Sequence, residues 1–366
     1  MKTNQTLIGD CRETLKQIPD NFVQTCITSP PYWGLRDYGT ATWEGGDENC
    51  DHKIGRETRG GLSDKQKTTK GSFGDEAIKN NQPCPKCGAI RKDTQLGLED
   101  TPEEYVENLV QVFREVKRVL RDDGTVWLNL GDSYGQQKGK GFNVNAKEGY
   151  VVSRRKELQE RQGNIDVKTN LPPKNLVGIP WRVAFALQAD GFYLRQDIIW
   201  HKPNPMPESV TDRCTKAHEY IFLLSKNKKY YFDHEAIKED CVGKDERQWA
   251  DTYDKVGSVV QGDTNAGIKR TKRYSKDGTF KRNKRSVWTV TTKPFKEAHF
   301  ATFPTDLITP CVLAGSGEGD VVLDPFMGSG TTGMVAQHLG RRWLGCELNE
   351  EYTDMQKERT SQQSLL

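Results

Sequence analysis

The segment Val321-Val-Leu-Asp-Pro-Phe-Met-Gly-Ser-Gly-Thr-Thr-Gly333 decides the fold that we expect. Its apolar start predicts a buried strand and its end predicts the first turn of a helix, with a G-x-G-x-x-G pattern between them. Glycines at such a turn let the backbone approach a ligand, and the first N–H groups of the following helix are free to bind it. The segment therefore predicts a nucleotide-binding turn, although a purely structural turn can have the same pattern.

An acid ends the next strand that we predict, at residues 342–347. A carboxylate at Glu347 can accept hydrogen bonds from both hydroxyls of a ribose, as in dinucleotide-binding proteins. However, only 33 residues follow Gly333 (334–366), too few for the rest of a nicotinamide-binding unit. We therefore expect the remaining chemistry on the N-terminal side of this segment.

The pattern along the rest of the chain predicts a three-layer α/β sheet interrupted by two insertions. The strongest helix signal begins at Thr101-Pro-Glu-Glu104, where an N-cap, a proline in the first turn and a capping-box acid precede an apolar stripe. The polar insertions divide the 366 residues into expected units. These units are core at 1–48, an inserted zinc-type segment at 49–94, core at 95–235, a target-recognition region at 236–293, and core with the glycine turn at 294–366.

The tetrapeptide Ser29-Pro30-Pro31-Tyr32 follows a predicted apolar strand at residues 22–28. Two prolines cannot extend a central strand, so the chain leaves the sheet with a stiff geometry. A serine hydroxyl and the first proline's carbonyl can accept hydrogen bonds from the exocyclic amine of a nucleobase, and the tyrosine ring offers a stacking face for a flipped base. Alone the tetrapeptide could be a capping turn, but together with the glycine turn it indicates methylation of a base.

These two motifs together resemble the β class of S-adenosylmethionine-dependent amino-methyltransferases of DNA, of bacterial or phage type. In that family the catalytic motif precedes the cofactor motif, which is the order found here. The resemblance implies a Rossmann-like methyltransferase sheet, S-adenosylmethionine as cofactor and double-stranded DNA as substrate, with a cognate restriction endonuclease as a candidate partner. The chain has no signal-peptide or membrane-span pattern, so we expect a cytoplasmic location and no membrane contact.

The resemblance also assigns roles to individual residues. Ser29, Pro30, Pro31 and Tyr32 match the catalytic motif. Matches to the cofactor site are Asp324, Pro325, Phe326, Gly328, Gly330 and Glu347. Two looser matches are Asp10, which resembles the acid near the adenine ring, and Phe303-Pro304, which resembles the element beside the methionine moiety.

The first residue of the catalytic motif bears on the base that is methylated. A serine accepts a hydrogen bond and keeps a donor for a ring acceptor such as cytosine N3, whereas an ionised aspartate only accepts. Within the family, Ser-Pro-Pro-Tyr resembles the cytosine-N4 enzymes and Asp-Pro-Pro-Tyr is more usual for adenine-N6. We therefore expect a site-specific cytosine-N4 methyltransferase, with adenine-N6 as the alternative, that works by direct displacement because the motif holds no cysteine nucleophile.

Basic residues are concentrated in one stretch near the end of the expected target-recognition region. Residues 268–285 carry nine Lys or Arg against one acid, while the whole chain has a formal net charge of only +3. Such a block favours contact with a polyanion, although a solvated loop is the plain alternative. The expected phosphate contacts are Lys269, Arg270, Lys272, Arg273, Lys281, Arg282, Lys284 and Arg285.

The first insertion contains Cys50-Asp-His52 and Cys84-Pro-Lys-Cys87-Gly88. A C-x-x-C-G turn aims two thiolates at one ion, and nine cysteines without a secretory signal favour thiols or metal ligands over disulfides. We predict a structural zinc bound by Cys50, His52, Cys84 and Cys87, with unligated thiols as the alternative. This zinc should lie near the active-site cleft, take no part in methyl transfer, and leave cofactor binding intact if it is lost.

Two other functional classes share part of these signals. A nicotinamide-dependent oxidoreductase would explain the glycine turn and Glu347 but not Ser-Pro-Pro-Tyr. A non-catalytic zinc-containing nucleic-acid-binding protein would explain the basic block and the C-x-x-C motif but not the catalytic motif.

Overall fold

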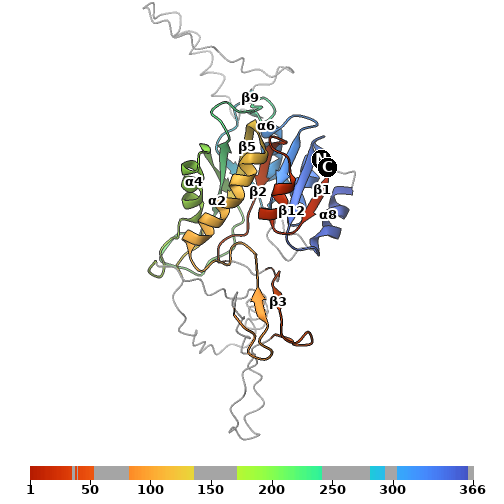
Figure 1. Cartoon of the computed structure of the whole chain (residues 1–366). Coiled ribbons are helices and arrows are strands. Elements are labelled where there is room, and N and C mark those ends of the chain that lie inside the picture. The colour runs from red at the N-terminus through yellow and green to blue at the C-terminus, as the bar shows by residue number, and fades with distance from the viewer. Residues whose placement is uncertain are drawn as a thin grey trace, which may run out of the picture.

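The computed structural model describes residues 1–34, 38, 40–52, 82–135, 171–240, 281–292 and 303–361. Its centre is an eight-stranded sheet with helices on both faces, which confirms the expected α/β class (Figure 1). Across the sheet the strands are β1 (Gln5–Ile8), β12 (Arg342–Glu347), β11 (Val321–Asp324), β2 (Val23–Thr28), β5 (Leu120–Leu130), β7 (His218–Ser225), β6 (Tyr193–His201) and β10 (Val287–Thr289).

The sheet is mixed. The first five strands in this spatial order are parallel, β7 is antiparallel to both β5 and β6, and β10 is parallel to β6. Two small antiparallel ladders lie outside it, one of β3 (Thr42–Glu44) with β4 (Ile90–Lys92) and one of β8 (Glu239–Asp240) with β9 (Lys281–Arg282). β3 and β9 lie at opposite ends of the molecule (Figure 1).

Helices cover both faces of the sheet. One face carries α1 (Cys11–Thr14), the 3₁₀ turn η1 (Leu15–Gln17), α2 (Pro102–Val119) and α4 (Ile179–Ala189). The other carries α6 (Thr305–Gly315) and α7 (Thr331–His338), and α8 (Tyr352–Ser361) packs against α7. Neighbouring strand residues alternate between the two cores: Cys26 and Leu323 belong to the first, Ile27 and Val322 to the second. The central strands β2 and β11 are therefore buried on both faces, as a three-layer fold requires.

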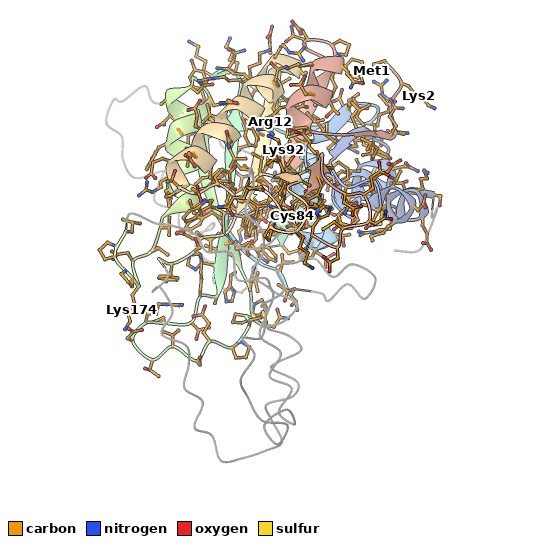
Figure 2. The ribbon with its side chains drawn as sticks, turned by 60° about the horizontal axis from the view of Figure 1, so that its bottom comes forward. Met1, Lys2, Arg12, Cys84, Lys92 and Lys174 are labelled. Carbon is orange, nitrogen blue, oxygen red and sulfur yellow. The ribbon has the colours of Figure 1, made fainter. Side chains whose placement is uncertain are left out.

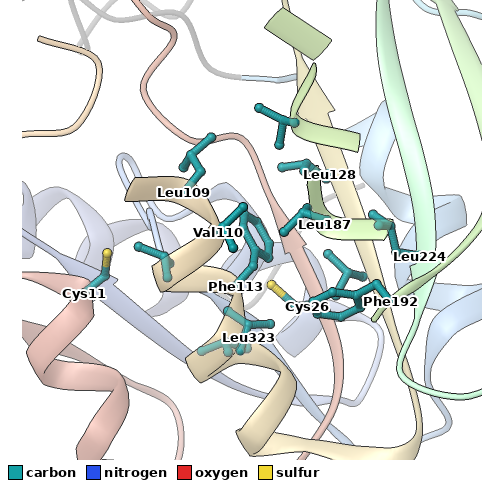
Figure 3. Close-up of a cluster of buried hydrophobic side chains, with 14 of the residues drawn as sticks. Cys11, Cys26, Leu109, Val110, Phe113, Leu128, Leu187, Phe192, Leu224 and Leu323 are labelled. Atoms are coloured by element: carbon teal, nitrogen blue, oxygen red, sulfur yellow. The ribbon is translucent and has the colours of Figure 1, made fainter. Parts of the chain in front are cut away.

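The first core shows how the predicted apolar stripe of α2 is used. Thr101 caps the helix by accepting a hydrogen bond from the Glu104 backbone N–H at 3.2 Å. Leu109 and Phe113 of this helix pack with Leu187 of α4 over the sheet (Figure 3). Burial of this stripe fixes α2 on the sheet and confirms the most regular helix that the sequence predicts.

The structure differs from the sequence prediction at the edges of the two insertions. β3 pairs with β4, so the inserted segment includes residues 42–44, which the sequence pattern assigns to the core. β10 joins the main sheet, although the sequence pattern assigns residues 287–289 to the target-recognition region. We therefore propose to begin the inserted segment near residue 42 and to end the recognition region before residue 287.

The order of the strands marks the place where a ligand should bind. The chain passes from β11 through α7 on one face to β12, and from β2 through α2 on the other face to β5. β11 and β2 are therefore neighbours at a point where the connections diverge, and such points bind ligands at the carboxyl ends of the strands. Among the described helices, none has the length and apolar character needed to cross a membrane.

Candidate functional site

A pocket lies at the carboxyl ends of β1, β2, β11 and β12, at the predicted switch point. It brings together nine of the sequence-predicted residues: Asp10, Ser29, Pro31, Phe303, Asp324, Pro325, Phe326, Gly328 and Glu347. Pro30, Tyr32, Pro304 and Gly330 flank the pocket in the chain but do not line it. Two motifs almost 300 residues apart in sequence thus form one site.

Asp324 joins the two central strand ends. Its carboxylate accepts hydrogen bonds from the Thr28 hydroxyl and the Thr332 hydroxyl, each at 2.6 Å, and from the Phe326 backbone N–H at 3.0 Å. Burial raises the pKa of Asp324 to about 6, against its three hydrogen bonds, which favour the charged form. Since both oxygens are occupied, Asp324 acts by fixing the glycine turn beside Ser29.

Glu347 stands opposite the glycine turn. Its carboxylate accepts hydrogen bonds from the backbone N–H groups of Gly328 at 2.7 Å and Asn349 at 2.9 Å, and burial raises its pKa. The turn itself needs a left-handed residue at Gly330, where φ is +82°, just before α7. Gln356 of α8 braces the turn by donating a hydrogen bond to the Gly328 carbonyl at 2.7 Å.

Asp10 lies at the end of β1 and caps α1. It accepts a hydrogen bond from the backbone N–H of Arg12 at 2.9 Å and forms an ion pair with the guanidinium of the same residue. Arg12 also donates to the Thr94 carbonyl at 3.2 Å, and Thr94 belongs to the chain that returns from the inserted segment. The adenine-side acid that the resemblance assigned is therefore held between α1 and that returning chain.

Ser29 and Tyr32 form the start of a polar network at the ends of β2, β5 and β7. Ser29 donates to the Tyr32 hydroxyl at 3.3 Å, and that hydroxyl lies 2.8 Å from Glu219 Oε2 and 3.1 Å from Asn129 Oδ1. Glu219 also forms an ion pair with Lys202. The ring of Tyr32 packs so closely on Gly131 that a Cβ atom there would lie 2.5 Å from it. Tyr32 is therefore held by Ser29 on one side, by Glu219 and Asn129 at its hydroxyl, and by Gly131 against its ring.

The two proline carbonyls of the motif differ in their surroundings. The Pro31 carbonyl accepts a hydrogen bond from the Tyr105 hydroxyl of α2 at 2.8 Å. Among the described residues, none donates a hydrogen bond to the Pro30 carbonyl. The Pro30 carbonyl, which the motif predicts to accept a hydrogen bond from the amine, is therefore available to a ligand.

Sequence reasoning missed several residues of the site. The pocket is also lined by Tyr38, Thr40, Thr94, Gln95, Leu96, Asn349, Tyr352 and Met355. Asn129, Lys202 and Glu219 complete the network around Tyr32. A signal existed for Asn129 and Glu219, because polar residues at the ends of apolar strands gather at one sheet edge. Thr94–Leu96 had no local signal, because their place depends on the ladder of β3 and β4.

The four residues predicted to bind metal come together. One ligand atom from each of Cys50, His52, Cys84 and Cys87 lies within 4.8 Å of the others. Cys50 and His52 follow β3 in the chain, and Cys84 and Cys87 precede β4. The ring of Trp43 stacks on His52 with centroids 4.0 Å apart.

The basic block is only partly described. Lys269, Arg270, Lys272 and Arg273 lie outside the described residues. Arg282 and Arg285 both form ion pairs with Glu239, at 2.9 and 2.6 Å, and Lys284 lies over the Trp288 ring. Because β9 is at the opposite end of the molecule from β3, this placement does not support contact between Lys281–Arg285 and a base entering the pocket (Figure 1). Their contact with DNA phosphates stays a prediction.

The fold and the pocket define the class as an α/β protein with a Rossmann-like ligand site at the β11–β2 switch point. The "DNA methylase" family model matches residues 23–358, and the chain belongs to that family. A curated relative, the type II methyltransferase M.Cfr9I of Citrobacter freundii, is 39% identical over 348 residues, which are 95% of this chain and 84% of the relative. The expected S-adenosylmethionine-dependent amino-methyltransferase family is thereby confirmed.

Solved structures agree with the fold. The PvuII DNA methyltransferase, described as cytosine-N4-specific, aligns with a TM-score of 0.55 at 16% identity over 100% of this chain and 89% of its own. A putative DNA modification methylase from Thermus thermophilus, complexed with S-adenosyl-L-methionine, aligns with a TM-score of 0.50 at 21% identity over 98% and 93%. At these identities the likeness shows the methyltransferase fold.

Proposed function

We propose that this DNA methylase transfers the methyl group of S-adenosylmethionine to the exocyclic N4 of a cytosine flipped out of double-stranded DNA. The hydrogen bond between Thr28 and Asp324 carries the proposal most directly. It places Ser29, the next residue, beside the glycine turn, and both line one pocket. A methyl donor at the turn and an amine at Ser29 would therefore be neighbours.

The residues of the pocket fit the proposed cofactor. The N-terminus of α7 offers backbone N–H groups, while the Gly328 N–H holds Glu347 against the turn, so that the remaining lone pairs of its carboxylate can accept from ribose hydroxyls. Asp10 and Phe303 line the same pocket, as their looser assignments require. When bound, S-adenosylmethionine supplies a methyl group on an already activated sulfonium leaving group.

The chain contributes orientation and hydrogen bonding to the transfer. The Ser29 hydroxyl and the Pro30 carbonyl accept hydrogen bonds from the amine, which directs the nitrogen lone pair towards the methyl group. Tyr32 offers its ring as a stacking face, with its hydroxyl held by Glu219. The exocyclic nitrogen would attack the methyl carbon itself, S-adenosylhomocysteine would leave, and the methylated amine would release one proton to solvent, so no covalent bond to the protein is needed.

The choice of cytosine rests on Ser29. A serine hydroxyl can accept from the amine while its single O–H, which is donated to the Tyr32 hydroxyl in this structure, turns to a neighbouring ring acceptor such as cytosine N3. Adenine N6 is the alternative within the same family. A nicotinamide-dependent oxidoreductase has no remaining support, because the family model spans both motifs.

We also propose that the enzyme belongs to a restriction-modification pair. The support is its likeness to relatives named as type II methyltransferases. A restriction endonuclease that recognises the same site would be its functional partner.

Transfer of tritium from labelled S-adenosylmethionine to DNA tests the proposed reaction. Ser29→Ala should reduce labelling at least about 100-fold, whereas the matched control Ser361→Ala, at an exposed helix end, should label as the parent does. Tyr32→Ala removes the stacking face, which is worth about 1–3 kcal/mol, so labelling should fall roughly 5- to 150-fold. Tyr32→Phe keeps the ring and should reduce labelling less. Full labelling by both Ser29→Ala and Tyr32→Ala would show that the proposed site is wrong.

A further inference from the structure

We propose that Cys50, His52, Cys84 and Cys87 bind one zinc ion, and that this ion holds one wall of the cofactor pocket in place. Three thiolates and one imidazole complete a tetrahedron, so the site is closed and has no position for a substrate. The metal part of this proposal stands on the four side chains alone. The part that concerns the pocket rests on the proposed function.

Two of the six distances between the ligand atoms can be compared with a tetrahedral zinc site, and both match it. Zinc–sulfur bonds of about 2.3 Å and zinc–nitrogen bonds of about 2.0–2.1 Å imply sulfur–sulfur separations of about 3.8 Å and sulfur–nitrogen separations of about 3.6 Å. The Sγ atoms of Cys50 and Cys84 are 3.8 Å apart, and Cys87 Sγ lies 3.6 Å from His52 Nδ1. Hydrogen bonds between thiols could also give these two spacings, so the convergence of all four ligand atoms within 4.8 Å of one another is the observation that points to one ion.

The backbone prepares this geometry. Cys84 donates its N–H to the Ala89 carbonyl at 2.7 Å, and Gly88 donates to the Cys84 carbonyl at 2.8 Å, which closes the turn that presents Cys84 and Cys87 to one point. Stacking of Trp43 on His52 fixes the imidazole plane from the other strand. Both halves of the ligand set are therefore aimed at one point.

The described part of the segment has a small core. Within residues 42–52 and 82–92, the hydrophobic cluster contains Cys84 and Ala89 as buried residues, with Trp43, Cys50 and Cys87 packed partly against them. Three of these five are proposed ligands. Because metal binding can supply the folding free energy that a small core lacks, the ion would be the main source of order here.

The ordered segment continues directly into the cofactor pocket. Strand β4 ends at Lys92, and the buried Asp93 follows, paired with Arg91 at 2.8 Å. Asp93 Oδ1 accepts from the Thr40 hydroxyl and from the Gln95 backbone N–H, both at 3.0 Å. Thr40 and Gln95 line the pocket, so Asp93 ties the two chains of the inserted segment together at the pocket wall.

A second contact fixes this wall to the core. Arg12, which is paired with Asp10, donates to the Thr94 carbonyl at 3.2 Å. Arg12, Cys84 and Lys92 are seen together in Figure 2, in the view from the end of the molecule that carries β3. Loss of the metal should therefore loosen Thr94–Leu96 and weaken cofactor binding. The sequence-based expectation is that cofactor binding survives without zinc, and calorimetry decides between the two.

Metal analysis tests the ion. Protein purified without chelator should contain about one zinc per chain, Cys87→Ser should contain none, and Cys214→Ser, at an exposed cysteine outside the site, should keep the metal. Should Cys87→Ser fail to fold, cobalt exchanged into the unmodified protein should give the absorption of a tetrahedral thiolate site. Unmodified protein without zinc, or without that absorption, overturns the proposal.

Calorimetry with S-adenosylhomocysteine tests the link to the pocket. We expect at least about tenfold weaker binding by Cys87→Ser and by Asp93→Asn, with zinc retained in the second variant, and parental affinity in Cys214→Ser. Parental affinity in both Cys87→Ser and Asp93→Asn overturns the bracing role. If the unmodified protein held zinc but bound no S-adenosylhomocysteine, the proposed function would fail and the metal site would stand.

Discussion

At the residue scale, the carboxylate of Glu219 in β7 accepts a hydrogen bond from the Tyr32 hydroxyl across the end of β5. Glu219→Gln keeps the size of the side chain but replaces the carboxylate with an amide. That carboxylate accepts hydrogen bonds from the Tyr32 hydroxyl, Asn129 Nδ2 and Lys202. Hydrogen bonds to charged groups contribute about 1.5–3 kcal/mol, so we expect methyl transfer to slow by about 10- to 100-fold.

Two further measurements show where this effect arises. Binding of S-adenosylhomocysteine should be unchanged, because Glu219 does not line the cofactor pocket. Glu13→Gln, at an exposed ion pair with Lys16, is the matched control and should have the parental rate. A parental rate in Glu219→Gln would mean that Tyr32 needs no support from β7.

At the scale of elements, the turn between β11 and α7 depends on a left-handed residue. Gly330→Ala should cost roughly 1–2 kcal/mol of stability because φ is +82°. Its new Cβ would also lie 3.2 Å from Gln356, the side chain that braces the turn. We therefore expect at least about tenfold weaker binding of S-adenosylhomocysteine by calorimetry.

Gly319→Ala separates the two effects. Gly319 also has a positive φ, +76°, but a Cβ there would meet nothing within 4 Å. This variant should lose similar stability in thermal unfolding and keep parental cofactor affinity. Equal losses of affinity in both variants would show that the turn responds to global stability and not to its own geometry.

The same scale shows what the sequence could and could not predict. Strands β11, β2 and β5 and helix α2 were predictable because their apolar patterns are local and their ends carry proline, glycine or capping signals. Helix α6 was missed, since Pro310 and the mixed run Thr305–Gly315 hide its period. Strand β10 has only three residues and is a strand because it pairs with β6. A local sequence pattern cannot predict that pairing.

For the site, the predictable residues are those whose chemistry depends on a motif. Ser29, Asp324 and Glu347 stand at strand ends beside glycine or proline, where composition itself marks the turn. Thr94–Leu96 reach the pocket only because β4 pairs with β3 across a long insertion. Such a position follows from tertiary structure, and no local sequence signal accompanies it.

At the scale of the whole molecule, two groups of residues in the basic block can be tested separately. Arg282 and Arg285 neutralise Glu239, so replacing both with Gln should mainly lower stability. Replacing Lys269, Arg270, Lys272 and Arg273 with Gln should instead flatten the salt dependence of DNA binding, by roughly 0.9 in slope for each phosphate that the protein no longer neutralises.

Titration of DNA binding against salt concentration distinguishes these two groups of residues. The parent and the Arg282→Gln/Arg285→Gln double variant should have the same slope, and the fourfold variant a smaller one. A slope that falls only in the double variant would place the DNA at β9 and would favour the sequence-based expectation for Lys281–Arg285.

The methyltransfer itself is tested most directly by the identity of the modified base. DNA incubated with the protein and S-adenosylmethionine would be digested to nucleosides, and the methylated nucleoside identified by mass spectrometry against standards. The expected product is N4-methylcytosine, which should be absent when Ser29→Ala replaces the parent. N6-methyladenine would contradict the cytosine assignment, and 5-methylcytosine or unmodified DNA would contradict transfer to an exocyclic amine at Ser29.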